Sequence, residues 1–318
     1  MLEYNVFYAY RRKGGEQVEN SNIKGHLCAL WSILIWGTTF VVTKVLLTEF
    51  TPIEILCIRF FMAWVLLLSF DHSRIKTNGL KDELLFILAG FFGVVVYFLF
   101  ENTALTYTTA SAVGILVSVS PFFTAVISRL FLGERTKKYF LAGFVIAMAG
   151  IIFITFKGDA DKALDFRGVS LAALAALSWA VYSTITKKIS TMGVKPAPMT
   201  RHIFFYALII CIPVAKIMDF SVSINSFFNI KTAISFMFLG LLGSGVCYVT
   251  WNTALKFLGA VKTSVYIYLI PVVTVVFSVI FLREKITLME ILGIILIFAG
   301  LFISDRDYLF KAAGTVKE

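Results

Sequence analysis

The chain has 318 residues, of which 59% are hydrophobic and only 15% are charged, and its formal net charge is +10. Soluble domains carry about 25% charged residues, so this composition excludes an ordinary soluble domain. The positive charge lies in short segments between apolar stretches, where Lys and Arg usually set membrane topology. It therefore does not indicate nucleic-acid binding.

The apolar residues are grouped in blocks of about 20, the length that crosses a bilayer as a helix. Lipid offers no hydrogen-bond partners, so backbone groups must bond within each segment. The fold class is therefore predicted to be an all-α integral membrane protein with ten transmembrane helices. These predicted spans are 26–47, 53–70, 83–102, 109–132, 138–156, 167–189, 200–217, 231–256, 262–282 and 288–304.

The segments outside the spans give an orientation. Most of their Lys and Arg residues fall on the same side as the N-terminus, which is typical of the cytoplasmic side. Residues 1–25 and 305–318 are accordingly predicted to be cytoplasmic tails, and 157–166 an outside linker. We expect a multi-pass protein of a bacterial-type plasma (inner) membrane.

The chain contains an internal repeat. The segment from Glu101 to Glu134 reappears, in register, from Trp251 to Glu284, and further matches join the halves 26–156 and 167–304. Each half has five predicted spans, so the second half is expected to enter the membrane from the opposite side. Inverted repeats are typical of secondary transporters, which bind substrate near mid-membrane between the repeats. The matched pairs include Trp36/Trp179, Asn102/Asn252, Pro121/Pro271, Gly143/Gly293 and Gly150/Gly300.

A known family shares these landmarks. They are Trp36-Gly37-Thr38-Thr39-Phe40, Pro52 with Arg59-Phe60, Asn-x-Ala-Leu after the third and eighth spans, Pro121 and Pro271, Glu134 and Glu284, and the spaced glycines of spans five and ten. The chain resembles the EamA-type transporters of the drug/metabolite transporter superfamily. The resemblance implies a central cavity lined mainly by helices 1, 3, 4, 6, 8 and 9, and export of amino acids or other small metabolites. Arg201-His202 is only a loose counterpart of Arg59 in the second half.

Aromatic residues at mid-depth are the main candidates for a cavity wall. Tryptophan usually lies at membrane interfaces, so the matched pair Trp36 and Trp179 indicates a cavity, with bulky packing as the alternative. Buried tyrosines need a hydrogen-bond partner, although Tyr266 and Tyr268 cannot both face one cavity. The predicted cavity residues are Trp36, Thr39, Tyr97, Ser118, Pro121, Trp179, Tyr182, Tyr248, Tyr266 and Pro271.

Four polar residues have an open role. Arg59 lies inside a span, where a charge is a functional hypothesis by default, and binding of loop carbonyls is the alternative. Glu101 is a candidate for binding a proton or a cationic group, but its predicted place at a loop edge favours simple exposure. Asn102 and Asn252 are candidates for substrate contact, and helix capping is favoured.

Other residues are predicted to be structural. Lys44 and Lys187 are expected to snorkel to the interface rather than act as gates. Glu134 and Glu284 precede spans five and ten, where an acidic group suits a helix N-terminus. Pro121 and Pro271 interrupt backbone bonding within their spans, either as hinges or as static kinks.

No enzyme signature is found in the sequence. It has no Walker loop and no paired Cys/His site, and the cysteines are expected to be buried small hydrophobic residues. We therefore expect no catalytic residue, metal, cofactor or nucleic-acid partner. No acidic residue is expected clearly at mid-membrane, so proton coupling has no support in the sequence, and facilitated diffusion stays open.

The favoured function is a secondary transporter that exports amino acids or related small metabolites by alternating access in the bilayer. Uptake of a vitamin-like or nucleoside-like solute is one alternative, and a non-transport membrane enzyme or scaffold is another. A monomer and a homodimer both stay open.

Overall fold

The computed structural model describes residues 2–73, 75, 77, 79–108, 110–134, 139–155, 165–218, 220–221, 229–282 and 288–304. These ranges contain helices and no strand. The predicted tail 305–318, the linker residues 157–164 and Glu284 lie outside them.

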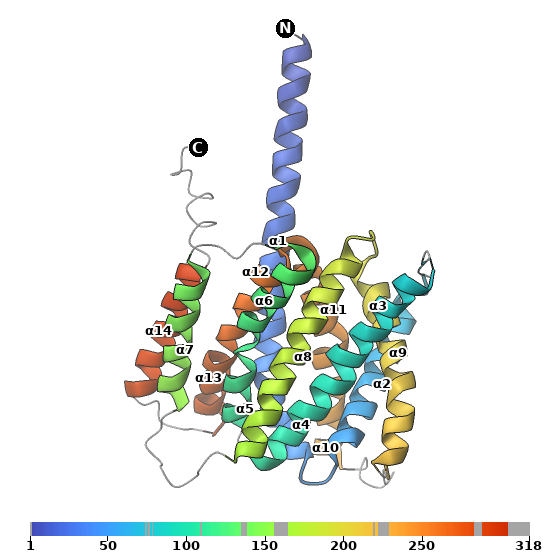
Figure 1. Ribbon diagram of the computed structural model, residues 1–318, viewed down its shortest axis with the longest axis vertical. Helices are drawn as coiled ribbons and strands as arrows, with labels where there is room; N and C mark the ends of the chain where they lie inside the picture. The colour runs from blue at the N-terminus through green and yellow to red at the C-terminus, as the bar shows by residue number, and fades with distance from the viewer. Residues whose placement is uncertain are drawn as a thin grey trace.

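The helices pack into one bundle (Figure 1). Those of the first half are α1 (Leu2–Leu46), α2 (Pro52–Phe70), α3 (Leu80–Gly90), η1 (Phe91–Val96), α4 (Tyr97–Tyr107), α5 (Ala110–Val117), α6 (Ser120–Leu132) and α7 (Phe140–Thr155). Those of the second half are α8 (Phe166–Ser190), α9 (Pro196–Ile217), α10 (Ile230–Met237), η3 (Phe238–Val246), α11 (Cys247–Leu258), α12 (Ala260–Ser264), η4 (Val265–Leu269), α13 (Ile270–Leu282) and α14 (Leu288–Ser304).

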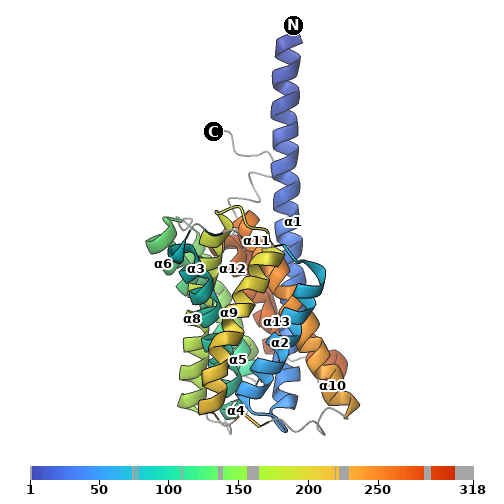
Figure 2. The same cartoon turned by 90° about the vertical axis from the view of Figure 1, so that its right-hand side faces the viewer.

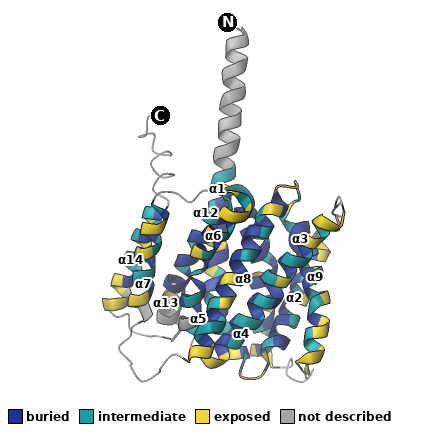
Figure 3. Ribbon diagram, viewed as in Figure 1, coloured by how far each residue is buried: buried dark blue, intermediate teal, exposed yellow. Residues whose placement is uncertain are grey.

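Seven helical segments of the described chain are long and apolar enough to cross a membrane. They are Ser21–Leu46, Pro52–Phe70, Leu80–Tyr107, Val113–Leu132, Phe166–Ser190, Pro196–Ile217 and Ile230–Leu258. Three shorter apolar segments are Phe140–Phe153, Ala260–Thr274 and Ile291–Ser304. Buried residues gather at the centre of the bundle (Figure 3). Large apolar side chains such as Leu130 and Ile217 are exposed. An exposed apolar surface of this kind suits lipid, and the protein is a multi-pass membrane protein.

The first helix is longer than the sequence predicts. α1 begins at Leu2, and Figures 1 and 2 show its N-terminal end extending past the rest of the bundle. Its apolar part is Ser21–Leu46. Hydropathy detects only this part, because the residues before it are polar although they continue the same helix.

The apolar segments Leu80–Tyr107 and Ile230–Leu258 each contain a π-helical stretch. These stretches are η1 and η3, and they include the matched residues Gly93 and Gly243. A π-helical turn changes which backbone carbonyls bond within the helix, and such turns are frequent at functional sites. Gly93 also packs directly under the Tyr182 ring, since a Cβ at Gly93 would lie 2.0 Å from that ring. The sequence periodicity does not predict these π-helical stretches.

The segments 110–132 and 260–282, where the sequence predicts the fourth and ninth spans, are each built from separate helical pieces. Tight turns join the pieces: Ser118 N bonds to Ile115 O at 3.0 Å, and η4 is a 3-10 helix. Pro121 and Pro271 each lie in the first turn of the second piece, α6 or α13. A proline is tolerated there because its missing N–H would have no partner in the helix. Pro121 therefore begins a helix after a turn, and Pro271 begins an α-helix directly after the 3-10 turn η4.

At one edge of the bundle, α7 and α14 pack closely side by side (Figure 1). A Cβ at Gly143 would lie 2.5 Å from Gly300 O, and a Cβ at Gly150 would lie 2.5 Å from Gly293 O. Only glycine permits such an approach. The matched glycines of the two halves therefore face one another crosswise.

Candidate functional site

A cavity lies at the centre of the bundle, between α1, α2, α4, α5, α8, α11, η4 and α13. Its lining residues are Trp36, Thr39, Phe40, Arg59, Tyr97, Phe98, Glu101, Val117, Trp179, Tyr248, Ile267 and Ile270. The free space is about 20 Å³, little more than the roughly 10–15 Å³ that one water molecule needs. A metabolite therefore fits only when side chains or helices around the cavity move.

Two tryptophans and two tyrosines form an aromatic wall of this cavity. The rings of Trp36 and Trp179 meet edge to face, with centroids 5.2 Å apart and an interplanar angle of 88°. Tyr248 lies 5.8 Å from Trp36 and 5.7 Å from Trp179, and Tyr97 lies 5.0 Å from Trp179. Edge-to-face pairs at this distance are stabilising and fix the rings against one another. The structure thus brings the matched tryptophans into direct contact.

The backbone of the π-helical stretches supplies acceptors to this wall. Trp36 Nε1 donates to Gly243 O at 2.8 Å, and the Tyr248 hydroxyl donates to Gly93 O at 2.7 Å. By the repeat, Gly93 O would be the acceptor for Trp179, but Tyr248 occupies it. The residue that matches Tyr248 in the first half is Phe98, which has no hydroxyl.

The indole donor of the second tryptophan has no such acceptor. Trp179 Nε1 is buried and has no hydrogen-bond partner in the described part of the chain. A buried donor without an acceptor costs about 1–3 kcal/mol. The two matched tryptophans therefore differ: Trp36 is bonded to the backbone, and Trp179 has no hydrogen-bond partner in the described chain.

Arg59 is the charged group of the cavity that sequence analysis left most open. Its side chain is completely buried on α2. Nε donates to Ser244 Oγ at 2.8 Å, and Cζ lies 4.2 Å from the centroid of the Phe98 ring, within cation–π distance. Nη1 and Nη2 have no hydrogen-bond partner among the described residues. The alternative that Arg59 binds loop carbonyls is therefore wrong, because the side chain points into the bundle.

Glu101 lies in the same cavity. It is 2% exposed, in the last turns of α4, and its carboxylate interacts electrostatically with Tyr97 and Arg59. Arg59 and Glu101 both belong to the described chain, and no side-chain nitrogen of Arg59 forms an ion pair with a Glu101 carboxylate oxygen within 4.0 Å. The expectation that Glu101 sits exposed at a loop edge is wrong, because α4 continues beyond it to Tyr107. An acidic residue is therefore buried inside the bundle, contrary to expectation.

The predicted cavity residues divide into two groups. The lining includes Trp36, Thr39, Tyr97, Trp179 and Tyr248. The other five predicted residues do not line the cavity: Ser118, Pro121, Tyr182, Tyr266 and Pro271.

Each of the other five residues has a different setting. The Tyr182 hydroxyl donates to Asn252 Oδ1 at 2.8 Å, and Ser118 Oγ donates to Gly114 O at 2.7 Å. Tyr266 contacts the His26 ring. The two prolines are buried at the starts of α6 and α13.

The matched asparagines connect helices instead of capping them. Asn102 Nδ2 donates to Pro52 O at 3.1 Å, at the start of α2. Asn252 Nδ2 donates to Thr200 Oγ1 at 3.0 Å on α9, in addition to its bond with Tyr182. The expectation of capping is wrong because α4 and α11 continue past the asparagines, so neither lies at a helix start.

The matched lysines bind the ends of neighbouring helices. Lys44 Nζ donates to Leu105 O and Thr108 O at the end of α4, and Lys187 Nζ donates to Lys256 O at 3.1 Å near the end of α11. Helix C-termini carry partial negative charge and attract cations. Both ammonium groups therefore bind at helix ends, and their snorkelling to the membrane interface stays a prediction.

Glu134 binds the start of a helix from the other half. Its Oε1 accepts from Ala260 N at 3.3 Å and its Oε2 from Val261 N at 3.2 Å. Glu134 was expected to lie at the N-terminus of the helix that follows it in the chain, which is α7. It binds instead the N-terminus of α12.

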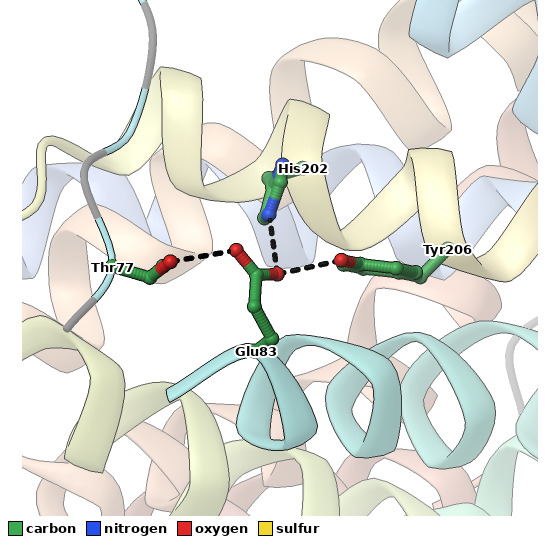
Figure 4. A network of polar contacts seen from close by, with 4 residues as sticks. All are labelled: Thr77, Glu83, His202 and Tyr206. Atoms are coloured by element: carbon green, nitrogen blue, oxygen red, sulfur yellow. Dashed lines mark hydrogen bonds and ion pairs between the residues drawn. The ribbon is translucent and has the colours of Figure 1, made fainter. Parts of the chain in front are cut away.

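A second polar cluster, which sequence analysis missed, joins α3 to α9 (Figure 4). Glu83 Oε2 accepts from the Tyr206 hydroxyl at 2.6 Å and lies 3.0 Å from His202 Nε2, and Glu83 Oε1 accepts from Thr77 Oγ1 at 2.8 Å. The side chains of Glu83 and His202 are each 26% exposed. Glu83 and His202 each lie near the end of a predicted span. They are so far apart in the chain that no local sequence pattern predicts their contact.

Comparison with known proteins shows which family and which relatives this chain is similar to. The profile of the EamA-like transporter family matches residues 23–156 and again 166–304. An "Uncharacterized transporter" of Archaeoglobus fulgidus is 30% identical over 288 residues, which cover 89% of this chain and 98% of that protein. A "Probable amino-acid metabolite efflux pump" of Escherichia coli (strain K12) is 29% identical over 303 residues, covering 92% and 98%.

A solved crystal structure shares the fold. It superimposes with a TM-score of 0.70 at 18% identity, covering 89% of this chain and 96% of the other. The chain belongs to the EamA-like transporter family, which confirms the resemblance inferred from its motifs.

Proposed function

We propose that this protein is a secondary transporter that exports amino acids or related small metabolites by alternating access across the plasma (inner) membrane. The observation that carries this proposal is the central cavity, in which Arg59 and Glu101 are buried together with aromatic rings. Charged residues inside a membrane protein mark substrate or ion pathways. The relative named a probable amino-acid metabolite efflux pump supports both the direction and the substrate class.

The proposed architecture is ten transmembrane helices in two inverted five-helix repeats, with both termini in the cytoplasm. The double family match and the seven long and three shorter apolar segments support it. So does the crosswise approach of Gly143 to Gly300 and Gly150 to Gly293, which a two-fold axis between α7 and α14 would produce. The excess of Lys and Arg in segments on the N-terminal side supports the orientation.

Transport in this proposal involves no chemical conversion. The aromatic wall and the two charges bind the solute, and movement of the halves exposes the cavity to each side in turn. The small free space corresponds to a conformation in which the cavity is nearly closed. The broken spans that contain Pro121 and Pro271 are where a change in backbone angle would cost least.

An export assay in cells tests the proposal. Bacterial cells fed a dipeptide hydrolyse it and accumulate the free amino acids inside. Cells that express this protein should release those amino acids faster than cells with an empty vector, and should tolerate a higher dipeptide concentration. Faster uptake of external solute with no change in release would contradict export.

A further inference from the structure

We infer that Arg59 and Trp179 bind the carboxylate of the transported molecule, and that Glu101 binds its ammonium group. The inference rests on the proposed function and narrows its substrate class to free α-amino acids, with the side chain held against the aromatic wall. It assigns a carboxylate to the buried donors of Arg59 and Trp179, which lack acceptors in the described chain, and an ammonium group to the Glu101 carboxylate, which interacts with Tyr97 and Arg59 within the protein.

The free donors favour a carboxylate. Arg59 Nη1 and Nη2 and Trp179 Nε1 are buried and lack acceptors in the described part of the chain, and both side chains line the cavity. A guanidinium presents its donors in a planar fork that matches the two oxygens of a carboxylate. Because the bond from Nε to Ser244 Oγ holds the group in place, the fork is oriented before the ligand arrives.

Glu101 selects against ligands that carry only negative charge. Its carboxylate lines the same cavity as Arg59, and the two side chains are not in ion-pair contact. A simple anion would satisfy Arg59 and leave Glu101 next to a second negative charge. A doubly charged phosphate would make this repulsion larger. A zwitterion supplies one opposite charge to each group, so it is the ligand that leaves neither charge uncompensated.

The other residues that line the cavity determine which amino-acid side chains it accepts. Trp36, Tyr97 and Tyr248 offer ring faces and edges, and Val117, Ile267 and Ile270 are apolar. Apolar and aromatic walls with a few fixed polar groups are the usual form of a small-molecule site. We therefore expect apolar or aromatic amino acids to bind more tightly than acidic or basic ones.

A ligand series on the unmodified protein tests the inference without any substitution. Binding to the full-length protein in lipid nanodiscs is measured for phenylalanine, phenethylamine and 3-phenylpropionate, which differ only in the carboxylate and the ammonium group. We expect phenylalanine to bind at least 10-fold more tightly than either analogue. Equal affinity of phenylalanine and phenethylamine would overturn the carboxylate site.

Substitutions then assign the two groups. Arg59→Gln should reduce phenylalanine affinity at least 10-fold and leave phenethylamine unchanged. Glu101→Gln should weaken the binding of phenylalanine and leave the binding of 3-phenylpropionate unchanged or tighter. Arg59→Lys keeps the charge without the fork and should retain part of the affinity. An equal loss for all three ligands in Arg59→Gln, in protein that still folds, would overturn the assignment.

A matched pair of tryptophans isolates the indole donor. Trp179 and Trp251 are both buried with unpartnered Nε1 atoms among the described residues, but only Trp179 lines the cavity. Trp179→Phe should lower the affinity for phenylalanine about 3-fold or more, and Trp251→Phe should leave this affinity unchanged. Equal effects would remove Trp179 from the site.

The outcomes separate this inference from the proposed function. If amino acids are exported but phenethylamine binds as well as phenylalanine, the site is wrong and the function stands. If 3-phenylpropionate binds through Arg59 while no amino acid binds or is exported, the carboxylate site stands and the amino-acid function and the role of Glu101 fall. If none of the three ligands binds, both the site and the proposed substrate class are wrong.

Discussion

Two polar clusters of this protein contain a carboxylate and a basic side chain, and they differ in how far their bonding is completed. The α3–α9 cluster consists of Thr77, Glu83, His202 and Tyr206; it is partly exposed, and both oxygens of Glu83 have partners. The cavity cluster consists of Arg59, Glu101 and Trp179; it is buried and leaves donors without acceptors in the described chain.

This difference in hydrogen bonding indicates a structural role for the α3–α9 cluster and agrees with the binding role that we propose for the cavity cluster. A partly exposed polar pair whose hydrogen bonds are complete contributes about 0–1 kcal/mol to stability. A buried charge without full compensation costs several kcal/mol, and within a membrane it marks a functional site by default. Arg59 and His202 occupy loosely corresponding places in the two halves, so the binding role that we propose for this repeat position in α2 has a packing counterpart in α9.

The largest effect is expected from Arg59→Gln. Truncating one member of a buried charged pair costs about 2–5 kcal/mol, which corresponds to a roughly 30-fold or greater loss of amino-acid export at low substrate. Reconstituted flux measures the loss, and circular dichroism and gel filtration check folding. Normal flux in this variant would contradict a binding role for the cavity cluster.

Glu101→Gln is expected to have the second largest effect. The substitution keeps the shape and removes the charge, so export of amino acids should fall by about 10-fold, or about 1.4 kcal/mol. Concentration dependence of flux distinguishes weaker binding from slower movement. If half-saturation stays constant while the maximal rate alone falls, Glu101 does not hold the substrate.

The matched tryptophans should give opposite results. Trp36→Phe leaves Gly243 O without its side-chain donor and should destabilise the protein by about 1 kcal/mol. Trp179→Phe removes a donor that has no partner in the described chain, so thermal stability should hold while substrate affinity falls. Thermal denaturation in detergent, with and without substrate, measures both. Equal destabilisation by the two substitutions would contradict the difference between the halves.

The smallest effect on transport is expected from Glu83→Gln. The side chain is 26% exposed, so its loss should reduce stability by no more than about 1 kcal/mol and leave the half-saturation concentration unchanged. The same flux assay and thermal denaturation measure this variant beside Arg59→Gln. A 10-fold loss of flux here would show that completed bonding does not distinguish structural from functional clusters.

The sequence predicts the general plan of this protein well. Each predicted span falls on helix in the described residues, apart from turns at 118–119 and at residues 47 and 139, because block length and hydropathy directly reflect the bilayer. The count of ten membrane crossings stays a prediction. The repeat also identifies Trp36 and Trp179 as a pair, and the structure places their rings in contact.

The site itself could be predicted only in part, for three physical reasons. The π-helical stretches at Gly93 and Gly243 shift the helix register, so a regular period of 3.6 residues misplaces the faces beyond them. The partners of Arg59 and Glu134 are Ser244 and the start of α12, and no local spacing reveals contacts so distant in the chain. Glu101 was expected at a loop edge because hydropathy ends the span near it, although the helix continues to Tyr107.

The most direct test of the central claim is phenylalanine flux from proteoliposomes that contain the wild-type protein, Arg59→Gln or Glu83→Gln. The account predicts rapid flux for wild type and Glu83→Gln, and a loss of at least about 30-fold for Arg59→Gln at low substrate. Equal flux through all three proteins would contradict it, because the cavity charge would then be no more important to transport than the peripheral one.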